Sequence, residues 1–139
     1  MTQKQKENAV NATYTKPPRA VQRISAILIR LNNLGVPLGP VHLMETGRAT
    51  FPIDVIRHEG HDWLVSIFGE TKWVRHARQT GQVRLRRGRR AQTFTAVEVH
   101  KPQSVALIEH MRREVRWNPW ASEALRADHE HPVFRIEPQ

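Results

Sequence analysis

The chain of 139 residues contains no cysteine, and this absence excludes several kinds of site. Without a thiol there is no disulfide framework, no thiolate nucleophile and no cysteine-based zinc site. A chain of this length can bury a sizeable core without a metal or a disulfide to stabilise it. Because the chain has no cysteine, its cysteine usage does not indicate an oxidising or a reducing compartment. The cytoplasm is the default expectation.

Long apolar runs are also missing from the sequence. Nothing approaches the length of a membrane span, and the N-terminal segment MTQKQKENAVNATYTKPPRA lacks the apolar core of a signal peptide. The polar composition of this segment, and the prolines near its end, predict that residues 1–19 form a flexible arm. We expect residues 20–139 to form a single domain of a cytoplasmic protein.

Acidic residues are scarce relative to basic ones. The chain has 13 Asp and Glu against 22 Lys and Arg, which gives a formal net charge of +9. An anionic partner is therefore expected: a nucleic acid, a lipid surface or a phosphorylated small molecule. A single arginine in a charge run is usually solvated, so only clusters carry weight. The clusters are KWVRHAR at 72–78, RLRRGRR at 84–90 and the basic run at 112–116.

The segment from Gly69 to Arg90 combines a helix start, an aromatic anchor and two of these basic clusters. Glu70 or Thr71 can cap a helix whose first amides are unpaired, and such a start favours a phosphate or carboxylate. Gly81 is placed to end this helix in a left-handed conformation. Positive charge comes from Lys72, Arg75, His76 and Arg78, and the apolar side from Trp73, Val74 and Ala77. The segment predicts an anion site.

The remaining pattern predicts strands in hairpins with helices inserted between them. Strands are expected at 41–46, 53–57, 63–68, 82–86 and 91–99, with a closing strand in HPVFRIEP at 131–138. Helices are expected at 21–34, from 101 to about 117, and at 121–127. This order differs from the strand–helix alternation of a parallel sheet. It predicts an α+β fold, an antiparallel barrel with helices packed outside.

The helix expected at 21–34 has an apolar stripe that includes Ile24 and Ile27, with Arg23 and Arg30 off the stripe. One interpretation is a structural helix that covers one end of the core. The alternative is a helix that docks on a membrane surface or on a partner.

Common catalytic and metal motifs are absent. The sequence has no G-x-S-x-G, H-E-x-x-H, Walker or G-x-G-x-x-G motif. His58 with His61, and His129 with His131, match no known set of ligand spacings, so no metal site is expected. Residues alone therefore predict only an anion-binding antiparallel barrel.

Four segments together resemble the deazaflavin-dependent nitroreductase family of actinobacterial proteins. They are LMETGR at 43–48, FGETKWVRHAR at 68–78, RLRRGRR at 84–90 and HPVFRIEP at 131–138, and the likeness spans about 36–138. The resemblance implies a split β-barrel related to the FMN-binding oxidoreductases. It also implies coenzyme F420, an 8-hydroxy-5-deazaflavin, as the cofactor that reduces a quinone, a nitroaromatic or an activated double bond. Such a small molecule would be the electron acceptor.

The resemblance also implies which residues hold the cofactor. The phosphate and acidic tail would contact Thr46, Gly47 and Arg48. The ring would be lined by Pro52 and Ile53, with Phe68, Trp73, Trp117 and Trp120 as further apolar walls. The strand end at Ser66, Ile67, Phe68 and Gly69 would approach the ring through its backbone, and the helix start at Lys72, Trp73, Val74, Arg75 and His76 would lie over the cofactor. Ser66 or water would donate the proton, although Ser66 can instead end a strand and Trp73 can instead anchor the core.

Two positions depart from the family pattern. After the Gly-Arg pair, family members usually continue with Lys or another residue, then Ser or Thr, Gly, two further residues and a second Arg. Here Arg48 is followed by Ala49, Thr50, Phe51 and Pro52, so the phosphate-binding segment is shortened. Loss of a charged hydrogen bond to an anion weakens binding by about 1.5–3 kcal/mol. His76 stands where family members often have Asn, a milder change because histidine also donates a hydrogen bond.

Other readings of the sequence stay open beside the F420 hypothesis. The same barrel with FMN, with haem or with no cofactor is one alternative. A basic module that binds nucleic acid through 84–90 and 112–116 is another, although no helix-turn-helix or finger pattern favours it. Related barrels often form homodimers. A quinone acceptor would lie in lipid, so the basic arm at 1–19 is a candidate for contact with the inner face of the membrane.

Overall fold

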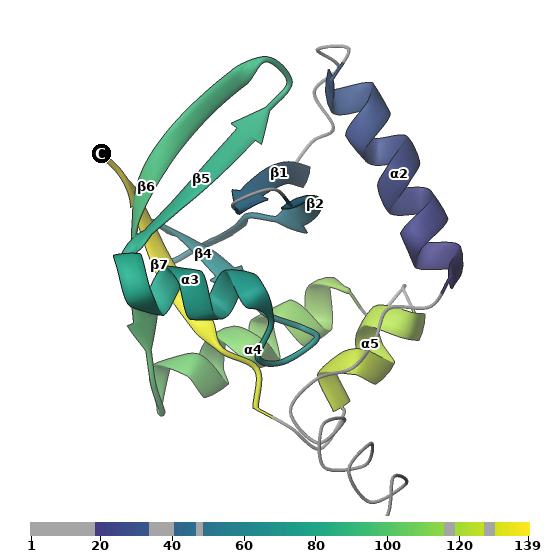
Figure 1. Ribbon diagram of the computed structural model, residues 1–139. Coiled ribbons are helices and arrows are strands. Elements are labelled where there is room, and N and C mark those ends of the chain that lie inside the picture. The colour runs from purple at the N-terminus through teal and green to yellow at the C-terminus, as the bar shows by residue number, and fades with distance from the viewer. Residues whose placement is uncertain (1–18, 34–40, 47–48, 116–118, 127–129) are drawn as a thin grey trace, which may run out of the picture.

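The computed structural model describes residues 19–33, 41–46, 49–115, 119–126 and 130–139. Its elements follow the order α2 (Arg19–Asn33), β1 (Val41–Thr46), β2 (Ala49–Asp54), β3 (Ile56–His58), β4 (His61–Val65), α3 (Lys72–Thr80), β5 (Gln82–Arg87), β6 (Arg90–Val99), α4 (Gln103–Glu114), α5 (Pro119–Arg126) and β7 (Val133–Pro138) (Figure 1). The α+β prediction is confirmed.

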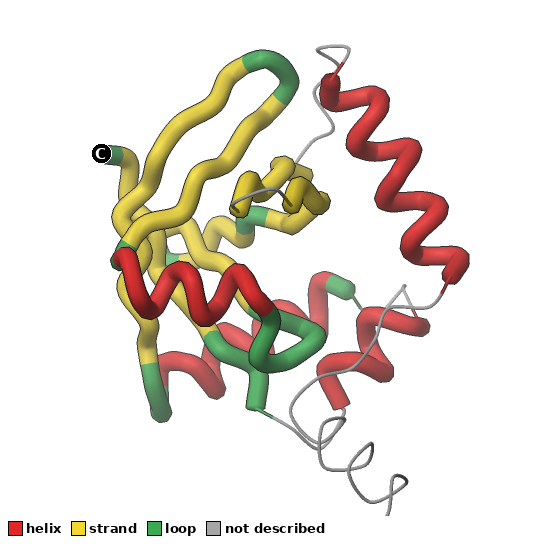
Figure 2. Tube along the Cα trace, viewed as in Figure 1, coloured by secondary structure: helices red, strands yellow, loops and turns green. Residues whose placement is uncertain are grey.

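The strands form one sheet in the order β2-β1-β5-β6-β7-β4-β3, and every pair is antiparallel. The two edge strands, β2 and β3, are joined through Val55 alone. Since one residue connects the opposite edges, the sheet has to curl until those edges lie close together. Figure 2 shows the resulting curl of the strands. The curled antiparallel sheet confirms the predicted barrel.

Some strand boundaries differ from the prediction. The strand expected at 53–57 is two strands, β2 and β3, that belong to opposite edges of the sheet. β4 starts earlier than expected and ends at Val65, before the predicted end at Phe68. Beyond it, the Gly69 amide donates to the Ser66 carbonyl at 3.3 Å, so these groups close a turn and do not extend the ladder.

Side chains on one face of the sheet form an inner core together with α3. Phe134, Leu64 and Leu85 point to this face, and each is at most 1% exposed. From α3 the core receives Trp73, Val74 and Ala77, which are the residues predicted for its apolar side. The Trp73 and Phe134 rings lie 5.4 Å apart between centroids. The predicted apolar side of α3 thus packs on this face of the sheet and contributes to the inner core.

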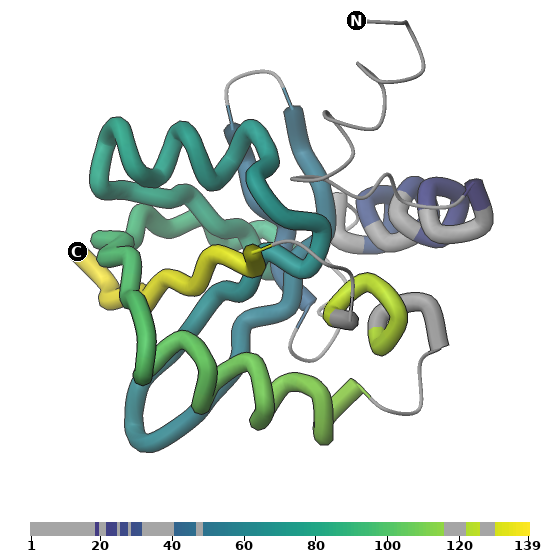
Figure 3. Tube along the Cα trace, turned by 90° about the horizontal axis from the view of Figure 1, so that it is seen from below, coloured from purple at the N-terminus to yellow at the C-terminus, as the bar shows by residue number. Residues whose placement is uncertain are grey.

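A second core lies on the opposite face of β4 and β7. Trp63 and Val133 alternate with the inward residues of their strands and pack against Leu107 and Met111 of α4. Figure 3 shows α3 and α4 on opposite sides of β7. The prediction of external helices is therefore confirmed for α4. One residue of its predicted apolar face, Val105, is instead 45% exposed.

The first described helix, α2, contacts β2 and leaves two residues of its predicted apolar stripe exposed. Ile24 is 53% exposed and Ile27 is 58% exposed. Their burial over one end of the core, the first of the two interpretations, is therefore wrong for these two residues. Of the predicted flexible arm at 1–19, residues 1–18 lie outside the described residues. None of the helices in the described ranges combines the length and the apolarity needed to cross a membrane.

Candidate anion site at the start of α3

The site is built on the turn that links β4 to α3. Ser66 is 2% exposed. Its hydroxyl donates to the Gly69 carbonyl and its amide donates to the Pro132 carbonyl at 2.9 Å. The Nδ1 atom of His131 lies 3.3 Å from the Ser66 carbonyl oxygen. Ser66 therefore orders this turn, and its hydroxyl proton is already used within the protein.

The first turn of α3 has no side-chain cap. Thr71 occupies the N-cap position in an extended conformation, but its side chain makes no capping hydrogen bond. Its Oγ1 atom is buried without a partner in the described part of the chain. The predicted capping by Glu70 or Thr71 side chains is thus wrong. Within the described ranges, the amides of Lys72, Trp73 and Val74 therefore have no capping acceptor at the positive end of the helix, an arrangement that favours an anion.

Cationic side chains surround these amides, and the first turn of α3 contains no acidic residue. Lys72, Arg75 and His76 are all exposed. Arg75 Nη1 donates to the Glu70 carbonyl at 3.5 Å, which ties the helix to the preceding turn. The side chains of Lys72 and His76 form no hydrogen bond or ion pair with any described residue, although the His76 carbonyl accepts from the Thr80 hydroxyl at 2.9 Å. Exposed basic side chains and the first amides of α3 therefore lie in the same turn of the helix.

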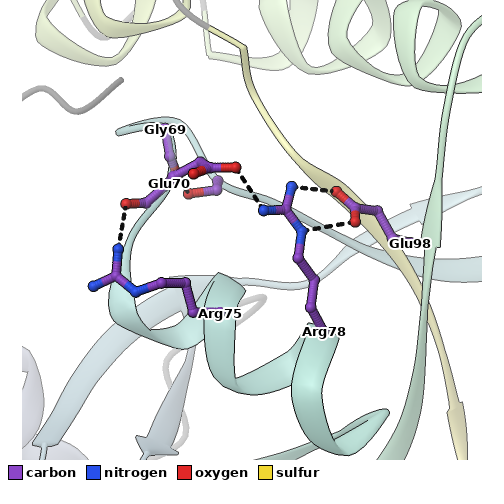
Figure 4. A network of polar contacts seen from close by, with 6 residues as sticks. Gly69, Glu70, Arg75, Arg78 and Glu98 are labelled. Atoms are coloured by element: carbon purple, nitrogen blue, oxygen red, sulfur yellow. Dashed lines mark hydrogen bonds and ion pairs between the residues drawn. The ribbon is translucent and has the colours of Figure 1, made fainter. Parts of the chain in front are cut away.

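Arg78 has a different environment. Its Nε and Nη2 atoms each donate at 2.8 Å to a carboxylate oxygen of Glu98 on β6, and its Nη1 atom donates to Glu70 (Figure 4). These hydrogen bonds lower the pKa of Glu98, against the opposing effect of burial. They also raise the pKa of Arg78. The prediction that Arg78 adds free positive charge to the site is wrong, because both acids already pair with it.

The arginine hairpin is also partly neutralised. Arg84 Nε and Arg86 Nε lie 3.2 Å and 3.1 Å from the carboxylate oxygens of Glu45 on β1. The three remaining arginines of the hairpin, Arg87, Arg89 and Arg90, are exposed and have no ion-pair partner within the described ranges. The unpaired charge of this segment is therefore concentrated at the tip, which Figure 1 shows at the far end of β5 and β6.

The strands β1 and β2 carry the other predicted cofactor residues. Thr46 pairs with Ala49 at the end of the hairpin, Pro52 pairs with Leu43, and Ile53 pairs with His42. Gly47 and Arg48 lie outside the described residues. Ile53 packs against the inner core that contains Trp73 and Val74, and α3 contacts β1. The fold therefore brings the β1–β2 hairpin and α3 to one core.

Several predicted side chains are unavailable to a ligand in this arrangement. Trp73 is 4% exposed and Val74 is 0% exposed, so neither side chain is available to contact a ligand. The core-anchor alternative for Trp73 describes its position. Ile67 packs against the second core, on the α4 side of the sheet, and Phe68 is half-buried. Trp117, and the side chain of Trp120, fall outside the described parts.

Sequence reasoning missed Glu98 and Glu45, the two acids that neutralise nearby arginines. Glu98 is 20 positions from Arg78 along the chain. Only the contact between α3 and β6 brings them together, so no local pattern marks the pair. A weak signal for Glu45 existed, since β1 and β5 could be expected to pair. No cluster of three or more His, Asp or Glu residues able to hold a metal occurs in the described ranges.

Comparisons with known proteins identify the fold. No protein-family model matches the chain, and no curated protein does so either. Among solved structures, a domain-swapped dimer matches with 18% identity over 85% of this chain and 99% of that chain, at a TM-score of 0.53. A structure titled F420-H2 Dependent Reductase (FDR-A) matches with 20% identity over 71% of this chain and 95% of that chain, at a TM-score of 0.50. Likeness at these identities concerns the fold, and the chain has the split β-barrel fold that the sequence resemblance implied.

Proposed function

We propose that this protein is an F420-dependent oxidoreductase that reduces a quinone, a nitroaromatic or an activated double bond. The observation that carries the proposal is the uncapped start of α3 beside exposed, cationic side chains. The motifs that resemble the deazaflavin-dependent family support it. So does the likeness in fold to a protein named as an F420-H2-dependent reductase.

The donor set at the start of α3 suits a cofactor with a phosphate and an acidic tail. Free amides donate to phosphate or carboxylate oxygens without adding charge, while Lys72 and Arg75 add the charge. We propose that these groups, with Thr46, Gly47 and Arg48, hold the anionic part of the cofactor. Pro52 and Ile53 would contact its ring. When bound, the coenzyme supplies the hydride.

The protein's own residues would orient the cofactor against the acceptor. No covalent nucleophile is required for such a reaction, since the cofactor carries the chemistry. The Ser66 hydroxyl is buried and donates to Gly69. We therefore propose that the proton that completes the reduction comes from water and not from Ser66.

A fluorescence titration with oxidised F420 tests the proposal, with FMN as competitor. We expect Lys72→Gln to weaken F420 binding about tenfold, because a charged hydrogen bond contributes about 1.5–3 kcal/mol. The matched control is Lys101→Gln, an exposed lysine before α4 with the same change in charge, and it should bind like the wild type. Absence of F420 binding to the wild type would refute the proposal. Preferential binding of FMN would support the flavin alternative, and bound haem would appear in the absorption spectrum.

The acceptor is identified by steady-state assays with reduced F420. A quinone, a nitroarene and an unsaturated ketone represent the three proposed classes. Oxidation of the coenzyme that depends on one of them assigns the class. If F420 binds but none of the three acceptors is reduced, the protein would be a cofactor-binding protein without these activities.

The tip of the β5–β6 hairpin favours a second candidate, binding of a nucleic acid. Arg87, Arg89 and Arg90 are exposed there without an ion pair among the described residues. Such contacts make affinity fall steeply with salt. Salt-dependent binding of DNA or RNA, weakened by Arg89→Gln and unaffected by Lys101→Gln, would support this candidate. Salt-independent or absent binding would exclude it.

Two further proposals concern location and assembly. The exposed Ile24 and Ile27, with arginines on the same helix, support contact of α2 with the inner face of a membrane by an otherwise cytoplasmic protein. The likeness to a domain-swapped dimer supports a homodimer. Sedimentation at several concentrations tests the dimer, and a mass that stays monomeric would exclude it.

A further inference from the structure

We infer that Arg78 is a positioning residue for the anion site, because it holds the Glu70 carboxylate away from the uncapped amides of α3. The inference rests on the proposed function, since it concerns the same site. It assigns a role to a residue whose side chain does not itself contact the proposed ligand.

Glu70 stands where it can compete with an anionic ligand. It immediately precedes the N-cap residue Thr71. A carboxylate near a helix start is attracted by the unpaired amides and by the positive end of the helix dipole. The Thr71 side chain does not cap them, so it does not compete with a carboxylate for these amides. A Glu70 side chain in that position would occupy the amides and repel a phosphate.

Arg78 prevents this arrangement through a guanidinium that is fixed from the other side. Two of its nitrogens bind both oxygens of Glu98, whose side chain is 19% exposed, and this two-point contact sets the plane of the group. The remaining terminal nitrogen then donates to the Glu70 carboxylate. Figure 4 shows Arg78 between the two acids, with Glu70 and Glu98 on different segments.

Arg75 restrains the same residue at a second point. Its Nη1 atom donates to the backbone carbonyl of Glu70, while Arg78 binds the carboxylate. Both arginines belong to α3, so the helix holds its own entry turn by backbone and side chain. Loss of Arg78 would release the Glu70 carboxylate, while Arg75 would still hold the Glu70 carbonyl. It would also leave Glu98 without its partner. These two consequences can be separated, because only the first one concerns the anion site.

The test compares Arg78→Gln, Glu70→Gln and the double variant Glu70→Gln/Arg78→Gln. Oxidised F420 binding is measured by fluorescence, and the melting temperature is measured in parallel. We expect Arg78→Gln to weaken binding about tenfold, the size expected for the loss of one charged contact. The double variant should bind within about threefold of the wild type, because its residue 70 carries no charge. The melting temperatures of Arg78→Gln and of the double variant should both lie below that of the wild type, because Glu98 is unpaired in each.

Control variants separate this role from general effects. Arg113→Gln removes the same charge from an exposed position on α4 and should change neither quantity. If Arg78→Gln does not fold, Arg78→Lys keeps the charge but not the two-point contact, and it should show a smaller loss that Glu70→Gln again reverses. A double variant that binds as weakly as Arg78→Gln would overturn the inference.

A measurement without any cofactor keeps the inference independent of the proposed function. In the NMR spectrum of Arg78→Gln at pH 7, the amide signals of Lys72, Trp73 and Val74 should move from their wild-type positions, because the released Glu70 carboxylate accepts hydrogen bonds from them. The double variant, which has no carboxylate at residue 70, should lack this shift. If it is absent from Arg78→Gln as well, the inference fails even where F420 binds. If it is present but F420 does not bind, the inference stands and the proposed function fails.

Discussion

Two amphipathic helices with basic residues behave differently in this protein. The 9-residue α3 buries Trp73, Val74 and Ala77 in the inner core. The 15-residue α2 leaves Ile24 and Ile27 more than half exposed. Periodicity predicted both helices equally well. The difference teaches that an apolar stripe is buried only where the sheet offers a face to receive it, and α3 follows β4 directly onto the inner face.

The same two helices also differ in the environment of their charged side chains. On α3, Arg78 binds Glu98 and Glu70, so part of its charge stabilises the fold. The sequence of α2, RAVQRISAILIRLNN, has three arginines and no acid. A helix whose arginines have no ion pair among the described residues and whose Ile24 and Ile27 are exposed suits an anionic surface.

The largest expected effect comes from truncation of the buried anchor of α3. Trp73→Ala should lower the free energy of unfolding by about 3–5 kcal/mol, because it removes a large core side chain and leaves a cavity. Urea denaturation measures this. Ile27→Ala on α2 is the matched control, and we expect it to stay within about 0.5 kcal/mol of the wild type. Equal losses in the two variants would show that α2 is as firmly packed as α3.

The Arg78–Glu98 pair gives the second prediction, on pH. Arg78 lowers the pKa of Glu98 below its ordinary value of 4.5, mainly by hydrogen bonds. A lowered pKa means that the stabilisation is complete above the value of the unfolded chain and is lost as pH falls through the lower value of the folded protein. The melting temperature of the wild type should therefore exceed that of Glu98→Gln at pH 7.

Below about pH 4.5 this difference should shrink toward zero. Melting curves of both proteins from pH 7 downward measure it. A difference that is constant over the whole range would mean that Glu98 stabilises the protein by packing alone.

The end of α3 gives the third prediction. Gly81 has φ of +69°, and a Cβ added there would meet no atom within 4 Å. The cost of Gly81→Ala should therefore come from the backbone alone and be about 1 kcal/mol. Gln79→Ala, at an exposed position of the same helix, serves as the control. A cost for Gly81→Ala no larger than that of the control would show that the helix end can adopt another conformation.

The smallest effect on stability is expected at α2. Ile24→Ser/Ile27→Ser should change the free energy of unfolding by less than about 0.5 kcal/mol for each position. Binding to vesicles with anionic lipid should nevertheless fall, because the apolar contact with the lipid is lost. Val105→Ser, on the exposed side of α4, is the control for vesicle binding. Unchanged vesicle binding of the α2 variant would exclude membrane contact through this helix.

Much of the local structure could be predicted from residues alone. The start of α3 after Thr71, its apolar side and its end at Gly81 follow from periodicity and from the left-handed preference of glycine. The break at Val55 could not be predicted, because only the closure of the sheet places β2 and β3 on opposite edges. The burial of Ser66 depends on contacts with residues near β7, far along the chain.

By itself, the sequence determined the helices, most strands and the concentration of positive charge at 72–78 and 84–90, because periodicity, turns and charge runs are local properties. Only the tertiary structure decided which of those charges are free. Ion pairs depend on the register and packing that bring Glu98 to Arg78 and Glu45 to Arg84 and Arg86. For the same reason, only the fold decided that α3 would keep an uncapped start while α2 would keep an exposed apolar stripe.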